Sequence, residues 1–357
     1  MAQSNDSAGM LDLMIHPGFC VKDNLVVKTN AAADNLRIQV GTPVQKLLAT
    51  GKKEYSHFTG GCLYLVLDVH GKRCSASVNR MEDMDIFLID QEAPESLQVL
   101  SLAARQLRDP LTSIMSVSGD LFSDFAASGN PHVLEQLARI QRGYYQMLRI
   151  IGNMSDAERY SDERPLAPEL IDITALMAET FEKANTLLKD AGINFTFSLP
   201  RSPVLGLASR EMLERAVLNL LSNSLKFTPK GGSVSAALAR RGNTLTLTVQ
   251  DTGEGITEAV RSSIFHRYLR PSAPEDHRHG IGLGMVLVRS AAVHHNGTVL
   301  VDCPEGSGIR VTMTIAIRSN PETVVQTPRL RIDYAGELDH TLIELSQVLP
   351  PDAYEIK

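Results

Sequence analysis

Three polar side chains share one face of a predicted helix within residues 217–232. Asn219, Asn223 and Lys226 stand four and three residues apart, which places them on one side of an α-helix. Mg²⁺ prefers oxygen ligands, and a lysine acts as a point charge on phosphate. The face therefore suits a phosphate chain with its metal ion, although a helix with a few solvated polar residues would explain these three positions equally well.

An aspartate and two glycines downstream add a second chemical element. Asp251 directly follows a predicted strand and begins the sequence Asp-Thr-Gly-Glu-Gly. A carboxylate fixed at a strand end accepts a hydrogen bond from an exocyclic amine, such as the one on adenine. Gly253 and Gly255 carry no side chain, so a ligand can approach the backbone beside the carboxylate.

A second glycine run, Gly-Ile-Gly-Leu-Gly at residues 280–284, opens another predicted helix. Backbone amides at a helix N-terminus form a cradle for phosphate. Between the two glycine runs, residues 256–279 are rich in Arg, Pro, Ser and His, which suits a mobile lid over a ligand. The lid arginines that could reach a terminal phosphate are Arg267, Arg270 and Arg278. Each glycine run alone would be ordinary turn chemistry, but four such pieces in one order argue against coincidence.

Composition bounds the class of protein that carries these motifs. A length of 357 residues favours two or three domains, and a net charge of −6 provides no basic field for nucleic acid or an anionic membrane. No run approaches 18 apolar residues, so no membrane span is expected, and the first residues lack a signal-peptide pattern. The four cysteines are scattered without zinc spacing, which favours reduced thiols in the cytoplasm.

Residues 1–92 alternate short predicted strands with turns. Strands are expected at 24–28, 61–68, 73–80 and 85–90, and a short helix at 30–36. This order resembles a small sensory domain of the PAS type, in which a strand pair, short helices and a three-strand hairpin enclose a pocket. A dimerisation module without a ligand is an equal alternative, because a fold does not fix a function.

Residues 93–160 are expected to form two long helices. The apolar residues of the first helix that follow the helical period are Leu100, Leu107, Leu111, Ile114, Leu121, Phe122 and Phe125. Those of the second helix alternate steps of three and four: Leu137, Ile140, Tyr144, Met147, Ile151 and Met154. One antiparallel hairpin cannot bury such stripes, so we expect a homodimer through a four-helix bundle. The alternative is that the hairpin packs against neighbouring domains of its own chain.

Residues 165–318 are expected to form a two-layer α/β sandwich with a mixed, mostly antiparallel sheet. Strands are predicted at 169–173, 193–199, 233–240, 244–250, 298–302 and 309–317, and helices from Thr174 as cap to 190, at 209–227 and at 284–295. A C-terminal extension, residues 319–357, should add a strand at 329–334 and a helix at 340–348 that Pro350 and Pro351 end. Leu342, Ile343, Leu345 and Val348 should face inward.

The four motifs of this sandwich resemble those of the sensor histidine kinases of two-component systems. The N box corresponds to residues 219–226, the G1 box to 251–255, the F box to 264–270 and the G2 box to 280–284. The resemblance implies the GHKL (Bergerat, HATPase_c) ATP-binding fold, shared with DNA gyrase, heat-shock chaperones and MutL proteins. It also implies a HisKA-like dimerisation and phosphoacceptor domain at 93–160, and a response regulator or partner kinase as partner.

The resemblance also implies the ligands and their residues. Asn223 would hold Mg²⁺ with the phosphates of ATP, assisted by Asn219, while Lys226 contacts phosphate and Asp251 binds the adenine amine. The residues that would line nucleotide and lid are Gly253, Gly255, Arg270, Gly280, Gly282, Leu283 and Gly284. The hydrolase relatives carry a water-activating Glu where this chain has Asn219, which disfavours a dedicated ATPase.

The first helix departs from the family at the phosphoacceptor motif. The family pattern is His-Glu-Leu-Arg-Thr-Pro-Leu, whereas residues 105–111 read Arg-Gln-Leu-Arg-Asp-Pro-Leu. Arg105 thus stands at the acceptor position, where we expect it to face solvent, and Gln106 at the acid–base position. A guanidinium stays protonated and is no nucleophile, and an amide is no general base.

Three hypotheses follow for a chain that resembles a protein histidine kinase, a phosphotransferase. In the first, it binds ATP as a pseudokinase, a scaffold or regulator that lacks autophosphorylation at the usual position. In the second, it phosphorylates another histidine, such as His132, His266, His277 or His279. In the third, it is a signalling adaptor that binds no nucleotide, against which Asn223, Lys226 and Asp251 argue.

Overall fold

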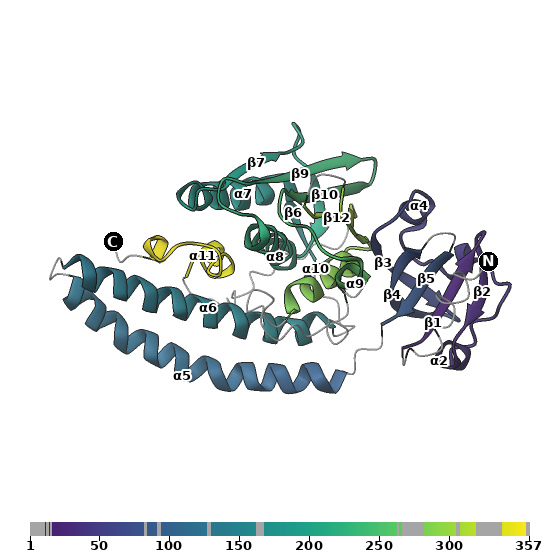
Figure 1. Ribbon diagram of the computed structural model, residues 1–357, viewed down its shortest axis with the longest axis horizontal. Helices are drawn as coiled ribbons and strands as arrows, with labels where there is room; N and C mark the ends of the chain where they lie inside the picture. The colour runs from purple at the N-terminus through teal and green to yellow at the C-terminus, as the bar shows by residue number, and fades with distance from the viewer. Residues whose placement is uncertain are drawn as a thin grey trace.

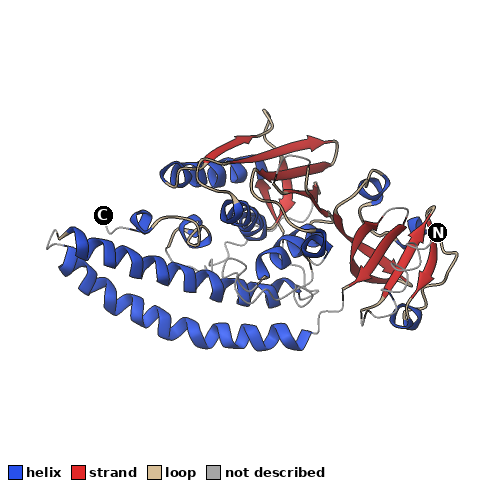
Figure 2. Ribbon diagram, viewed as in Figure 1, coloured by secondary structure: helices blue, strands red, loops and turns tan. Residues whose placement is uncertain are grey.

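The computed structural model describes residues 11, 14, 16–81, 84–90, 94–126, 130–161, 168–262, 264–265, 282–304, 308–318 and 338–354. Three parts are visible: an N-terminal sheet with short helices, a pair of long helices, and an α/β domain above that pair (Figures 1 and 2). Some predicted features lie outside the described residues. They are the lid arginines Arg267, Arg270 and Arg278, the three lid histidines, Gly280, and the strand at 329–334.

The N-terminal part folds as five antiparallel strands with three short helices. Its elements are β1(Gly18–Lys22), β2(Leu25–Thr29), α2(Ala31–Asn35), α3(Val44–Leu47), α4(Lys52–Ser56), β3(Cys62–Val69), β4(Lys72–Met81) and β5(Met84–Ile89). The strand order is β2-β1-β5-β4-β3. Phe19 and Phe87 stack at 4.7 Å in its core. Strand β1 was not predicted, because five residues without alternation give no clear period.

The long helices α5(Pro94–Ala126) and α6(Pro131–Ser161) run side by side (Figure 1). Ala104, Leu111 and Phe122 of α5 are buried, whereas other apolar residues of the same helix stay exposed. Those exposed residues are Val99, Leu102, Leu107, Ile114, Val117, Leu121 and Phe125. The opposite side of α6 packs on the α/β domain and the C-terminal segment. The alternative, packing within one chain, therefore occurs for α6, while α5 keeps an uncovered apolar stripe.

The α/β domain places helices on one face of a sheet. It contains β6(Glu169–Asp172), α7(Ile173–Asp190), β7(Asn194–Ser198), β8(Leu205–Ala208), α8(Arg210–Phe227), β9(Ser233–Arg241), β10(Thr244–Asp251), α9(Glu258–Ser262), α10(Leu283–His294), β11(Val299–Asp302) and β12(Arg310–Ala316). Among the strands that the structure describes, β7 alone pairs in parallel, with its neighbour β9. The predicted cap of α7 was wrong: the Asp172 carboxylate, not Thr174, accepts from the first backbone amides, because it stands one residue before the helix.

The two sheets join edge to edge. Strand β3 of the N-terminal part pairs antiparallel with β11 of the α/β domain, with Tyr64 opposite Val299 and Cys62 opposite Val301. A ten-stranded sheet results, in the order β2-β1-β5-β4-β3-β11-β12-β10-β9-β7, whereas β6 and β8 pair in a separate two-stranded sheet. Gly61 permits the close approach, since a Cβ there would lie 2.4 Å from the Val301 carbonyl oxygen and its φ is +96°. No sequence feature predicts this joint.

The C-terminal segment, residues 338–354, lies on α6 and α8 (Figure 1). It consists of α11(His340–Glu344) and a 3₁₀-helix, Pro351–Tyr354. The predicted helix to residue 348 is therefore too long, although Ile343 and Leu345 are fully buried as expected. Among the described residues, no helix combines the length and the apolar character that crossing a bilayer requires.

Candidate functional site

Helix α8 carries the polar face from which the site is built. Ser209 caps its start by accepting from the Met212 amide at 3.4 Å. Asn219 is fully buried, and its Nδ2 donates to the Arg215 carbonyl at 2.9 Å. That bond fixes the amide orientation and turns Oδ1 away from the helix, where it has no hydrogen-bond partner in the described part of the chain. A buried oxygen without a partner is costly unless a ligand uses it.

The start of helix α10 faces this oxygen. Gly282 precedes the helix in the left-handed conformation, with φ +76°. A Cβ on Gly284 would lie 2.7 Å from Asn219 Oδ1 and 3.7 Å from Asn223 Nδ2. The N-terminal turn of α10 therefore abuts the polar face of α8, and only glycine fits at this contact. Leu283 beside it is buried and anchors the turn.

Asp251 is held in one orientation at the end of β10. Its side chain is 2% exposed, and Oδ1 accepts from the Gly253 amide at 2.9 Å and the Ile309 amide at 3.0 Å. Both backbone donors bind the same oxygen, which leaves Oδ2 for a ligand. A Cβ on Gly308 would lie 1.9 Å from Oδ1, so residue 308 must be glycine. Sequence reasoning missed Gly308; the glycine-rich sequence Glu-Gly-Ser-Gly at 305–308 was the available signal.

The loop after Asp251 packs on the last turn of α8. A Cβ on Gly253 would lie 2.5 Å from the Phe227 carbonyl oxygen, and Gly255 has φ +72°. Lys226 is half-buried in that turn, with its ammonium 5.8 Å from the Phe227 ring centroid. The structure thus brings together the predicted residues of α8, the Asp251 loop and the start of α10. Arg270 and Gly280 lie outside the described residues.

These residues fit a magnesium nucleotide. The unpartnered amide oxygen of Asn219 and the neighbouring Asn223 supply the oxygen and amide groups that suit Mg²⁺ and phosphate. Gly284 lets the N-terminal turn of α10 pack directly against these amides, and that helix N-terminus favours negative charge. The oriented carboxylate of Asp251 suits an exocyclic amine.

A buried histidine fastens α10 to the start of α8. The Ser209 amide donates to His295 Nε2 at 3.1 Å, and Nδ1 lies 2.7 Å from the Ala291 carbonyl oxygen, which makes Nδ1–H the donor. Burial lowers the pKa of His295 to about 4, and the nearby charges of His294 and Arg318 act in the same direction. His295 is therefore neutral at physiological pH.

Position 105 lies on the other side of α6. Arg105 and Gln106 are both exposed on α5, which agrees with the solvent-facing orientation expected for Arg105. Helix α6 stands between α5 and the α/β domain (Figure 1). His132 begins α6, at the opposite end of the helix pair, so it lies about 30 Å along the axis from position 105.

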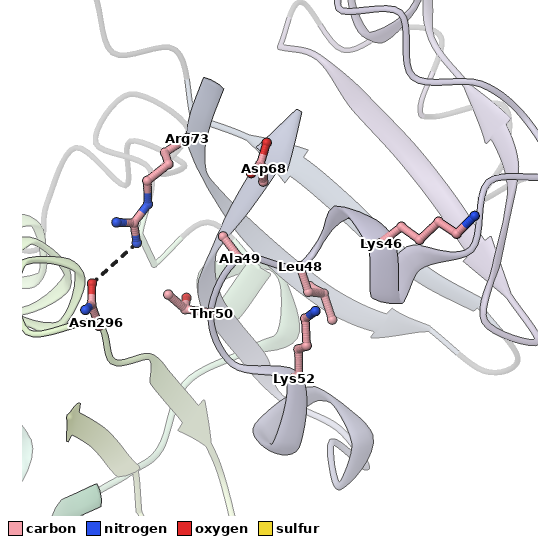
Figure 3. A pocket seen from close by; sticks show the side chains of 8 residues that line it. All are labelled: Lys46, Leu48, Ala49, Thr50, Lys52, Asp68, Arg73 and Asn296. Atoms are coloured by element: carbon pink, nitrogen blue, oxygen red, sulfur yellow. Dashed lines mark hydrogen bonds between the residues drawn. The ribbon is translucent and has the colours of Figure 1, made fainter. Parts of the chain in front are cut away.

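A separate pocket lies at the joint of the two sheets. It has a volume of about 620 Å³, and Arg73 crosses it to donate to Asn296 at 3.5 Å (Figure 3). The pocket is lined by Lys46, Leu48, Ala49, Thr50, Lys52, Asp68, Arg73 and Asn296. None of the predicted site residues lines it, so it is distinct from the site on α8.

Comparison with known proteins agrees with the site. Residues 208–319 match the family described as histidine kinase-, DNA gyrase B-, and HSP90-like ATPase. Over 253 residues the chain is 28% identical to histidine protein kinase DivJ of Caulobacter vibrioides, covering 70% of this chain and 42% of that protein. Over 236 residues it is 28% identical to sensor histidine kinase RppB of a Synechocystis strain, covering 65% and 52%.

A solved structure of full-length ShkA in complex with AMPPNP is also similar. It aligns with a TM-score of 0.49 and 21% identity, over 64% of this chain and 48% of that one. The chain spans about half the length, or less, of the first curated relatives it matches. Residues 208–319 belong to the histidine kinase-, DNA gyrase B- and HSP90-like ATPase family, and the chain is related to the sensor histidine kinases.

Proposed function

We propose that this chain is an ATP- and Mg²⁺-binding signalling protein of histidine kinase descent that lacks autophosphorylation at the usual position. The observation that carries the nucleotide part is the buried Asn219 oxygen, which has no partner among the described residues and faces Gly284 and Asn223. The part about phosphorylation rests on Arg105 and Gln106, which provide neither a nucleophile nor a base.

Each site residue has a role in this proposal. Asn223 holds Mg²⁺ together with the phosphates, with Asn219 assisting, and Lys226 binds phosphate. Asp251 accepts from the adenine amine through Oδ2, because backbone amides occupy Oδ1. The glycines of residues 253–255 and 280–284, with Arg270, line the remainder of the nucleotide.

The other parts of the chain fit a signalling role. The exposed apolar stripe of α5 supports a homodimer through residues 93–160, in which two copies form a four-helix bundle. The strand pair, short helices and three further strands of residues 18–89 support a PAS-like sensory domain. The protein then acts in the cytoplasm as a scaffold or regulator of a partner kinase or a response regulator.

Phosphorylation of another histidine is the weaker proposal. Phosphoryl transfer requires the acceptor close to the nucleotide and in line with it. His132 starts α6 at the far end of the helix pair, about 30 Å along the axis from position 105. The three lid histidines, His266, His277 and His279, lie outside the described residues.

A fluorescent ATP-analogue titration, with and without Mg²⁺, tests nucleotide binding. Asp251→Asn is the sharp variant: two backbone amides hold the Oδ1 position, so the new NH₂ points at the adenine amine, donor against donor. We expect about a tenfold to hundredfold loss of affinity. The matched control is Asp302→Asn, a half-buried aspartate at the end of β11. Absence of binding to the unaltered protein contradicts the proposal, and equal affinity in Asp251→Asn removes the adenine role.

A further inference from the structure

The C-terminal segment, residues 338–354, lies beyond the family match and carries no part of the nucleotide site. It nevertheless contains some of the most buried polar groups in the described part of the chain. Glu344 and Ser346 are both 0% exposed, and Ile343 and Leu345 beside them are fully buried. A segment that buries a carboxylate this deeply must have partners for it.

Those partners come from two different helices. Glu344 accepts from Arg149 Nε of α6 at 3.1 Å and forms an ion pair with Arg215 of α8. Arg215 also pairs with Asp156 Oδ2 of α6 at 2.7 Å and donates to Asn153 at 2.9 Å. Two guanidinium groups and two carboxylates thus share one buried site, with no net charge. Removing one partner from such a site leaves an uncompensated charge, which is strongly destabilising.

The backbone of the segment makes a second set of bonds to α6. Pro350 and Pro351 have no N–H, so the Ser346 and Gln347 carbonyls have no helical donor four residues on. Arg142 supplies the missing donors, to Ser346 and to Gln347 at 3.0 Å each, and Gln146 donates to Ser346 at 3.0 Å. These side chains of α6 therefore satisfy carbonyls of the segment that no backbone donor reaches from residues 350 and 351.

The same contacts reach the helix of the nucleotide site. Arg215 stands one turn before Asn219, and its carbonyl accepts the Asn219 side chain. Glu344 therefore links α6 to the helix that carries Asn219 and Asn223. It does so on the side of α6 away from α5, so α6 stays between the α/β domain and position 105 of the same chain (Figure 1).

We propose that residues 338–354 are an intramolecular strap that fastens the α/β domain to α6, with Glu344 as its positioning residue. The strap sets where the nucleotide site sits relative to α5. This inference does not require nucleotide binding, because every contact that carries it lies within the chain.

Amide hydrogen exchange of the full chain, without nucleotide, tests the strap. Glu344→Gln keeps the shape of the side chain and removes its charge, so we expect exchange about tenfold faster or more in α11 and in the part of α6 around Arg149. Glu214→Gln is the matched control. Glu214 is also on α8 and also contacts the segment, through His340 at 3.6 Å, but both side chains are partly exposed. The Glu214→Gln variant should exchange its α11 and α6 amides at rates within about twofold of the unaltered chain.

Two further variants keep the test decisive. Arg142→Ala with Gln146→Ala removes the three bonds to the strap carbonyls without disturbing the buried charges, and should also speed exchange in α11 and α6.

Glu344→Gln with Arg149→Gln restores charge balance around Arg215 and Asp156. The strap predicts that fast exchange persists in this pair, since the link from α11 to α6 stays broken, whereas return to the protection of the unaltered chain overturns it. The strap proposal is equally overturned if the Arg142→Ala/Gln146→Ala chain exchanges its α11 and α6 amides at the rate of the unaltered chain. A failed nucleotide titration would refute the proposed function and leave this result standing.

Discussion

Helices α8 and α5 carry the two groups of residues on which the proposed function rests, and the two groups differ in their chemistry. On α8, Asn219 and Asn223 face the glycine turn of α10, and Asp251 is oriented nearby by two backbone donors. On α5, residues 105–111 resemble the phosphoacceptor motif of the histidine kinases, and the exposed Arg105 and Gln106 stand where that resemblance would put the reactive residues. The α8 site offers polar groups that suit a nucleotide, whereas positions 105 and 106 of α5 offer neither a nucleophile nor a base.

The difference shows that packing and chemistry can be lost independently. Leu111 of α5 is buried against α6, whereas the exposed positions 105 and 106 contribute nothing to that packing. Substitution at exposed positions costs little stability, so residues 105 and 106 can differ from the family pattern without loss of the fold. On α8 the reverse holds, because Asn219 is fully buried and part of the packing.

The largest effect that we expect concerns the link that holds α10 against α8. The folded-state pKa of His295 is about 4 and the ordinary value is 6.5, so the unfolded chain binds the proton first as pH falls. The contribution of neutral His295 to the free energy of unfolding is fully present above about pH 6.5. It falls by about 3 kcal/mol as the pH drops toward 4. His295→Gln can still accept from the Ser209 amide and should lose this dependence. Urea denaturation at about pH 7 and about pH 5 gives the free energy of unfolding of each chain. An equal drop in that free energy for both chains between the two pH values would show that His295 is not the titrating group.

The next effect concerns the metal side of the nucleotide site. Asn223→Ala should weaken Mg²⁺-dependent binding of an ATP analogue about thirtyfold, or about 2 kcal/mol, through loss of a polar group at the phosphates. Without Mg²⁺ the variant and the unaltered chain should bind alike. Asn185→Ala, on helix α7, is the control and should bind normally. Unchanged affinity of Asn223→Ala in Mg²⁺ would remove this residue from the site.

A smaller effect is expected on the α5 side of the comparison. Ile114 is 53% exposed within the apolar stripe, so Ile114→Glu should weaken homodimer formation about tenfold by placing a charge in the seam. Ser116→Glu changes an exposed residue of the same helix outside the stripe and serves as control. Sedimentation equilibrium measures both. A monomeric unaltered chain, or equal weakening by the two variants, would contradict the four-helix bundle.

Local patterns predicted most elements of the α/β domain. The alternation of Leu245, Leu247 and Val249 places β10, and all three are buried. The polar face of α8 follows from helical spacing alone, and the glycine runs mark the turns beside it. These features depend on residues close together in the chain.

Contacts between distant segments could not be predicted in this way. Gly308 meets Asp251 from 57 residues away, and Glu344 meets Arg215 from 129 residues away. A charge pattern does not say which acid meets which base, and the edge pairing of β3 with β11 leaves no mark on either strand. Pro350 and Pro351 correctly forbid α11 from continuing beyond residue 349, but nothing in the sequence marks its observed end at Glu344.

Incubation with γ-labelled ATP tests the central claim most directly. The unaltered chain should bind an ATP analogue and acquire no acid-labile label, because Arg105 is no nucleophile. The variant Arg105→His with Gln106→Glu should acquire acid-labile label under the same conditions, and failure to do so would show that these two residues are not what blocks transfer. Acid-labile label on any histidine of the unaltered chain would contradict the account.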